Sequence, residues 1–251
     1  MVHNWIMLDA WTSPSVVLQL EPNEIQIWRL ILADARGVLE ECRQILSSEE
    51  QDQADCKLPG RVRNEFMYGR ACLRILLSQN LGKPASSVLI ASSQYGKPYL
   101  PEEPVLEFNV SHSHGIVLIA LSRRGSVGID LEYGNALTEV MKLAPMVFSP
   151  TEINRLKLLN TEAGRRYFFQ IWTRKEAIVK ADGRGLSLPL TSFDLPDESA
   201  SNMPVRAEGK LYYLNDIAAG EGYVSAIAAE SADCRMSMYD FPLSAFSQSY
   251  F

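Results

Sequence analysis

The chain has 251 residues, of which 47% are hydrophobic and 22% are charged, and its formal net charge is -6. This composition is typical of a folded globular protein with enough apolar residues for one large core or two smaller ones. The negative net charge argues against a general nucleic-acid-binding protein, because such domains usually carry a positive field. We expect any anionic ligand to be bound by local groups of basic residues.

The N-terminal sequence MVHNWIMLDAW has no basic region followed by a long apolar stretch. No apolar run approaches the roughly 18 residues that a membrane span requires. The four cysteines are scattered, without a CxxC pair or a neighbouring histidine, which argues against a zinc ribbon or a disulfide framework. We therefore expect a cytoplasmic protein that binds neither membrane nor nucleic acid.

The first elements are a strand at residues 25–30 and a long helix at residues 63–80. Between them, Ser47-Ser-Glu-Glu50 has the Ser-x-x-Glu form of a capping box, which predicts a short helix. Apolar residues recur at helical spacing along the longer segment, and Gly82 and Pro84 supply stop signals after it. We expect this helix to pack on a sheet.

Short strands are predicted at residues 88–90 and 108–110, followed by a buried strand at residues 115–122. The sequence RRGS at residues 123–126 is typical of a turn. We therefore predict that residues 127–132 return as the second arm of a hairpin with the preceding strand.

In the second half, Ser149-Pro-Thr-Glu152 combines an N-cap serine, a proline at the first helical position and a capping-box glutamate. It predicts a helix that ends at about Leu159. A second, longer helix is predicted from about residue 164 to residue 181, with Gly183 and Gly185 ending it.

The second half resembles the first, because GLSLPL follows its long helix as YGKPYL follows the earlier one. We predict an α+β fold with two similar α/β lobes related by pseudo-twofold symmetry and an active site in the cleft between them. The predicted lobes are residues 1–125 and 126–251, tightly packed against each other rather than independent domains.

The segment FFQIWTRKEAIVK places Glu176 one helical turn before Lys180 on one face of the helix. Most such pairs are surface salt bridges of small energetic value. Asp130 and Glu132 lie two apart on a predicted strand, so both side chains point to one face. Carboxylates of this kind suit Mg²⁺, which takes a few carboxylates together with waters and substrate phosphates. Glu176 is the candidate third carboxylate.

The segment FNVSHSHG gathers two hydroxyls and two imidazoles at the end of a strand, where they could donate hydrogen bonds to a phosphate. One alternative is that these side chains only cap the start of the hairpin. Another is a zinc site formed by His112, His114 and Asp130, although no clear third nitrogen or thiolate ligand accompanies them.

FNVSHSHG, VGIDLE and FFQIWTRKEAIVKADGRGLSLPL, in this order and preceded by QYGKPYL, resemble the signature blocks of the 4′-phosphopantetheinyl transferases. The chain length resembles the larger, two-lobed monomeric type that activates surfactin synthetase. The resemblance covers approximately residues 45–230. It implies transfer of the 4′-phosphopantetheine group from coenzyme A to a serine of an apo acyl or peptidyl carrier protein, with release of 3′,5′-ADP.

The resemblance also implies roles for individual residues. Asp130, Glu132 and Glu176 would hold Mg²⁺, or alternatively Mn²⁺, on the pyrophosphate, and Glu176 or a metal-bound water would accept the serine proton. Lys180 would stabilise the leaving 3′,5′-ADP. The residues implied to contact coenzyme A are Lys97, Ser111, His112, Lys175 and Lys180.

This chain departs from the family pattern at SSEEQDQAD, which is acidic where relatives often carry basic residues. We therefore predict that Arg63 and Arg70 bind the 3′-phosphate in their place; the alternative is a solvated basic helix face. The predicted partners are apo carrier proteins of fatty acid, polyketide or nonribosomal peptide biosynthesis. Alternative functions are a metal-dependent nucleotide phosphoesterase and a non-catalytic protein that binds coenzyme A or carriers.

Overall fold

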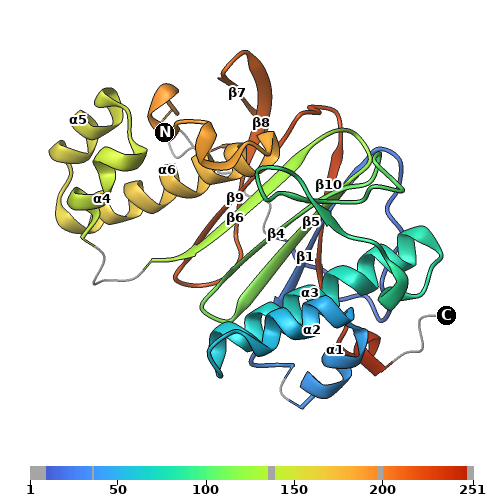
Figure 1. Cartoon of the computed structure of the whole chain (residues 1–251). Helices are drawn as coiled ribbons and strands as arrows, with labels where there is room; N and C mark the ends of the chain where they lie inside the picture. The colour runs from blue at the N-terminus through green and yellow to red at the C-terminus, as the bar shows by residue number, and fades with distance from the viewer. Residues whose placement is uncertain (1–9, 36, 135–138, 197–199, 248–251) are drawn as a thin grey trace.

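The computed structural model describes residues 10–35, 37–134, 139–196 and 200–247. Two four-stranded sheets form its centre, and each is covered on its outer side by one long helix (Figure 1). The first sheet has the order β10 (Arg235–Asp240), β1 (Glu24–Ile31), β5 (Ile116–Ser122) and β4 (Glu107–Ser113). The second has the order β6 (Val127–Tyr133), β9 (Tyr223–Ala229), β8 (Lys210–Ile217) and β7 (Met203–Ala207). The predicted α+β fold with two α/β lobes is confirmed.

The two long helices are α3 (Arg61–Leu81) and α6 (Thr161–Asp182). Shorter elements surround them, namely α1 (Leu39–Ile45), α2 (Ser48–Asp55), α4 (Val140–Val147), α5 (Pro150–Leu158), β2 (Ala91–Ser92), β3 (Pro98–Tyr99) and the 3₁₀ turns η1 (Ala85–Ser87), η2 (Gly185–Ser187), η3 (Leu190–Ser192) and η4 (Leu243–Ser247). None of the helices in the described ranges is long and apolar enough to cross a membrane.

The helix boundaries follow the local sequence signals. Ser47 and Ser149 each accept a backbone N–H while the glutamate three residues later reaches back, so both predicted capping boxes are confirmed. Both long helices end at a glycine in the left-handed conformation, Gly82 after α3 and Gly183 after α6. Glycine adopts this conformation at no steric cost, which explains why the helices stop there.

Strand β5 is buried on both faces and shows how the layers are arranged. Val117, Ile119 and Leu121 pack with α3, whereas the alternate residues of β5 face the second sheet. There they meet Ile129 and Leu131 of β6. The protein is therefore a helix–sheet–sheet–helix sandwich with one apolar core between the two sheets.

Two strand predictions are corrected. β6 pairs with β9 and β5 pairs with β1 and β4, so the turn at residues 123–126 carries the chain from one sheet to the other rather than closing a hairpin. The strand expected at residues 88–90 is replaced by β2, which begins at Ala91. The carbonyl of buried Val88 instead accepts a hydrogen bond from Arg74 of α3.

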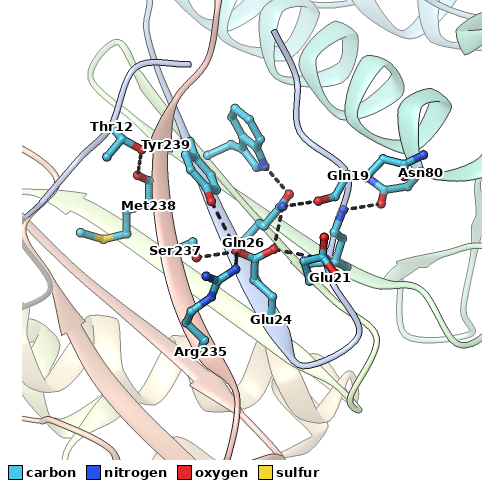
Figure 2. Close-up of polar contacts among 12 residues, drawn as sticks. Thr12, Gln19, Glu21, Glu24, Gln26, Asn80, Arg235, Ser237, Met238 and Tyr239 are labelled. Atoms are coloured by element: carbon cyan, nitrogen blue, oxygen red, sulfur yellow. Dashed lines mark hydrogen bonds and ion pairs between the residues drawn. The ribbon is translucent and has the colours of Figure 1, made fainter. Parts of the chain in front are cut away.

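The last strand, β10, joins the sheet of the first lobe by pairing in parallel with β1. Buried Glu24 of β1 anchors it by contacting Arg235 at 2.9 Å and by accepting hydrogen bonds from Ser237 and Tyr239 (Figure 2). One strand from the second half of the chain therefore completes the sheet of the first lobe, across the predicted division at residues 125 and 126.

Side chains of β4 join the two sheets where they meet edge to edge. Alternate residues of β4 accept hydrogen bonds from alternate backbone N–H groups of β6: Asn109 from Ile129 at 3.0 Å, Ser111 from Leu131 at 3.2 Å and Ser113 from Tyr133 at 3.2 Å. These three polar side chains take the place of a backbone ladder, so N–H groups of β6 that face the first sheet have partners.

Helix α6 lies directly on the backbone of β6 at Gly128. A Cβ atom at this position would lie 2.1 Å from the carbonyl oxygen of Ala177 and 2.3 Å from the backbone nitrogen of Ala181. Only glycine permits this approach, because both obstacles are backbone atoms of the helix. The absence of a side chain at Gly128 therefore sets the distance between α6 and β6.

We predict that Gly128→Ala destabilises the protein by an amount at the upper end of the roughly 1–3 kcal/mol typical of overpacking. The helix has to move away from β6, so transfer activity should fall as well. Gly69→Ala is the matched control, because a Cβ there would lie at an ordinary 3.4 Å from Val117. Urea unfolding of both variants measures the difference, and equal stabilities would contradict the close approach.

Candidate active site

Asp130, Glu132, Glu176 and Lys180 converge where α6 crosses β6. Gly128, Asp130 and Glu132 alternate along β6 and share the strand face that α6 covers. Lys180 Nζ lies 2.7 Å from Asp130 Oδ1 and donates to the carbonyl oxygen of Ile129 at 3.2 Å. The close contact at Gly128 thus brings the strand carboxylates and the helix residues into one group.

Burial and neighbouring charges raise the pKa of two carboxylates of this group, Glu132 and Glu176. Burial, and then the charges of Asp130 and Glu176, raise the pKa of Glu132 to about 7, against the opposing effect of Lys180. Burial and the charge of Asp130 also raise the pKa of Glu176. One ammonium therefore faces three carboxylates, an arrangement that favours an additional cation.

One oxygen of the group has no partner. Asp130 is buried, and its Oδ2 atom makes no hydrogen bond, whereas Oδ1 is bonded to Lys180 and Ser111. Among the described residues, no group of three or more histidine, cysteine, aspartate or glutamate side chains is already placed to hold a metal ion, this one included. An open set of carboxylates with an unused buried oxygen fits Mg²⁺, which completes its coordination with waters and substrate phosphates.

A groove leads from this group toward α3. A cavity of ≈ 290 Å³ is lined by Glu176 and Lys180 on α6 and by Lys97 in the loop before β3. A neighbouring cavity of ≈ 170 Å³, lined by Arg70 and His112, shares Pro98 and Val110 with the first. A third cavity, of ≈ 360 Å³, again contains Arg70 and Pro98 together with two serines of η1.

The basic residues of the groove come from separate elements. Lys97 Nζ donates to the carbonyl oxygen of Ala181 at 3.1 Å and lies 3.4 Å from Glu107, so it ties its loop to the end of α6. Arg70 on α3 lies 3.4 Å from Glu50 and over the ring of Phe66. Lys97 and Arg70 supply the local positive charge that an anionic ligand needs on this acidic protein, and His112 lies in the same cavity as Arg70.

The structure does not bring Lys175 to this site, which corrects the expectation of a pyrophosphate contact. Its side chain is fully buried, and Nζ lies 2.6 Å from Glu152 and donates to the carbonyl oxygens of Val147 and Leu190. All three N–H groups of the ammonium are used inside the second lobe. Lys175 thus fastens α6 to α4 and α5.

The structure also changes the ligand contacts expected for Ser111 and Arg63. Ser111 is buried, and its hydroxyl donates to Asp130 and accepts from Lys180 and Leu131 N, so its hydrogen-bonding capacity is used within the protein rather than on a phosphate. Arg63 pairs with Asp55 at 2.6 Å and lines none of the three groove cavities described above, whereas Arg70 lines two of them.

The structure also separates the residues of the zinc alternative. His112 lies 3.4 Å from Glu65, and His114 stacks on Tyr133 with ring centroids 4.9 Å apart. Asp130 is bonded to Lys180 and not to either imidazole in the described part of the chain.

The sequence interpretation overlooked Gly128 and Glu65. A period-two pattern of Asn109, Ser111 and Ser113 was visible in the sequence and would have indicated the inter-sheet hydrogen bonds.

Comparison with known proteins places the chain in a family. A model of the 4′-phosphopantetheinyl transferase superfamily matches residues 126–228, and a model of the 4′-phosphopantetheinyl transferase N-terminal region matches residues 36–124. The chain is 34% identical to the 4′-phosphopantetheinyl transferase HetI of Nostoc sp. strain PCC 7120 over 72% of this chain and 78% of HetI. It is 29% identical to 4′-phosphopantetheinyl transferase Sfp of Bacillus subtilis over 66% of this chain and 74% of Sfp.

The fold and the carboxylate–lysine site define a two-lobed α+β enzyme with a groove suited to an anionic ligand. The chain belongs to the 4′-phosphopantetheinyl transferase superfamily. It is accordingly an enzyme that transfers the 4′-phosphopantetheine group of coenzyme A to carrier proteins.

The raised pKa of Glu132 predicts a pH-dependent stability without metal. In the folded protein the pKa of this carboxyl is raised to about 7 from its ordinary value of 4.5, so it keeps its proton over most of that range. The contribution of Glu132 to the free energy of unfolding is therefore fully present below the pKa that this residue has in the unfolded chain. It is lost as the pH rises through the pKa that it has in the folded protein. Glutamine does not ionise, so Glu132→Gln should not lose stability in this way. We therefore expect the free energy of unfolding of the variant to rise relative to that of the wild type between pH 5 and pH 8.

Urea unfolding in the presence of a chelator measures this difference. The groups facing Glu132 are Asp130, Glu176, Lys180 and Ser113, and all are unchanged in the variant. A stability difference that does not change between pH 5 and pH 8 would contradict the assigned electrostatics.

Proposed function

We propose that the site works as a Mg²⁺-assisted phosphoryl-transfer site in which Asp130, Glu132, Glu176 and Lys180 act on the pyrophosphate of coenzyme A. The observation that carries this proposal is the convergence of the three carboxylates and one ammonium at the end of the groove, with one buried carboxylate oxygen unpaired. Asp130, Glu132 and Glu176 would hold the ion, which supplies charge neutralisation of the phosphoryl oxygens when it is bound.

The groove accounts for binding of the nucleotide. Coenzyme A carries a pyrophosphate and a 3′-phosphate, and Lys97, Arg70 and His112 line the successive cavities next to the carboxylate group. Lys97 and Lys180 share the cavity nearest the reacting centre, and Arg70 and His112 share the next one along. We assign the pyrophosphate to the first cavity and the 3′-phosphate to the second.

The chemical step is an attack by the carrier's serine oxygen on the β-phosphorus of coenzyme A. A new bond forms between the serine oxygen and this phosphorus, and the bond from the β-phosphorus to the bridging oxygen breaks, so that 3′,5′-ADP leaves. Glu176 accepts the serine proton, a role that its raised pKa favours because a stronger base captures the proton more readily. Lys180 stabilises the negative charge on the departing phosphate.

Exposed apolar residues on α4 suit a docking carrier. Met141 is 51% exposed and Met146 is 73% exposed, and Lys142 lies between them on the same short helix. This helix stands beside α5 at the end of α6 that is remote from the first lobe (Figure 1). Lys142 is itself paired with Glu139, so the exposed methionines are what distinguish this helix.

We propose an acyl or peptidyl carrier with an acidic surface as the partner at α4. Monomeric state and a cytoplasmic location belong to the same proposal. The facts that support carrier docking are the exposed Met141 and Met146 beside Lys142, which is paired with Glu139.

Transfer is tested by incubating the protein with coenzyme A, Mg²⁺ and a panel of apo carriers. We predict that the carrier gains the mass of phosphopantetheine, and that Asp130→Ala and Glu176→Gln lose at least about 100-fold of the rate while remaining folded. Glu162→Gln is the control, because Glu162 lies on the same helix but is exposed and pairs only with Arg166 in the described structure.

Two outcomes would contradict this assignment. Wild-type rates in Asp130→Ala or Glu176→Gln would show that the carboxylates are not in the reacting centre. Release of free phosphopantetheine without any carrier would favour the alternative of a nucleotide phosphoesterase.

Docking at α4 is tested by Met146→Asp, which places a negative charge on the proposed carrier surface. We expect the KM for an acidic carrier to rise about tenfold, equivalent to about 1.4 kcal/mol of binding free energy, while the Kd for coenzyme A stays unchanged. Val105→Asp is the matched control, since Val105 is similarly exposed at 58% and lies on the other lobe. Equal effects of both variants would exclude α4 as the docking helix.

A further inference from the structure

Glu65 on α3 is a buried carboxylate that holds the end of the β4–β5 hairpin. Its side chain is 7% exposed, and Oε1 accepts a hydrogen bond from the backbone N–H of Gly115 at 2.8 Å. The other carboxylate oxygen lies 3.4 Å from His112 Nδ1. Arg61, one turn earlier on α3, is more distant at 3.8 Å and is largely exposed.

A carboxylate is costly to bury unless hydrogen bonds or opposite charges compensate it. Here the closest compensation comes from Gly115 and His112, both in the hairpin. Gly115 has a positive φ of 90°, and the preceding His114 also lies in the left-handed region at 45°, so the turn has an uncommon backbone conformation. The carboxylate therefore fixes both the turn and the imidazole relative to α3.

This placement gives His112 a defined orientation toward the groove. Glu65 contacts Nδ1, so Nε2 is the nitrogen left for a ligand. The imidazole is 47% exposed and lines the cavity that also contains Arg70 and Phe66. The carboxylate beside Nδ1 fixes the orientation of the ring relative to this cavity.

We propose that Glu65 is a positioning residue that orients His112 and thereby strengthens binding of coenzyme A at the second cavity. The inference rests on the proposed function, because His112 is taken there as a contact of the 3′-phosphate. Glu65 also lines this cavity, and we assign its effect to the orientation of the imidazole rather than to a contact with the ligand.

A double-mutant cycle with calorimetric titration of coenzyme A tests this inference. We expect Glu65→Gln and His112→Ala each to raise the Kd about five- to tenfold, and the double variant to bind no more weakly than His112→Ala alone. The kcat at saturating coenzyme A should stay within twofold of the wild type. Titration with 3′-dephospho-coenzyme A should show little effect of either variant.

Glu24→Gln is the matched control, because Glu24 is an equally buried glutamate in β1 whose contacts lie around β10 (Figure 2). It should lower stability without changing the Kd for coenzyme A. If Glu65→Gln does not fold, Glu65→Asp withdraws the carboxylate by one methylene and enters the same cycle with the same expected non-additivity.

Independent, additive effects of the two variants would overturn the inference, and so would an unchanged Kd in Glu65→Gln. An unchanged Kd for coenzyme A in His112→Ala would also overturn the inference. If the wild type still binds coenzyme A in that case, the proposed function stands. Failure of the wild type to bind coenzyme A would instead refute the proposed function.

Discussion

The contact of α6 with the backbone of β6 at Gly128 is the constraint on which the site depends. A side chain at this position would collide with the carbonyl oxygen of Ala177, so only glycine lets the helix lie this close. Two and four residues further along β6, Asp130 and Glu132 emerge on the same face, opposite Glu176 and Lys180. Without this backbone contact, the carboxylates of β6 and the charged residues of α6 would not lie in one group.

A second constraint links this site to the other lobe. Ser111 of β4 accepts the backbone N–H of Leu131, donates to Asp130 and accepts from Lys180. One hydroxyl therefore joins the first sheet to the second and also orients the two charged groups of the site. Lys180 compensates part of the negative charge of the carboxylates, and the unpaired oxygen of Asp130 marks where compensation is incomplete. The packing of the two sheets and the proposed catalytic group thus share the same few polar contacts.

Local sequence signals predicted the helix ends well, because a capping box or a left-handed glycine acts within a single turn. The turn at residues 123–126 was misinterpreted, since RRGS reverses the chain in the same way whether the next strand joins the same sheet or another one. For Lys175, which directly precedes Glu176, the family resemblance implied a coenzyme A contact that the structure does not show. Consecutive helix residues differ by about 100° in direction, and this rotation turns Lys175 into the core of the second lobe. Glu65 could not be found from the sequence, because its partners lie 47 and 50 residues away.

Calorimetric titration of coenzyme A into the wild type, with and without Mg²⁺, tests the central claim most directly. If three carboxylates and Lys180 form a metal-assisted pyrophosphate site, Mg²⁺ should tighten coenzyme A binding in the wild type and lose this effect in a variant that combines Glu132→Gln with Glu176→Gln. Identical affinities with and without Mg²⁺ in the wild type would contradict the account.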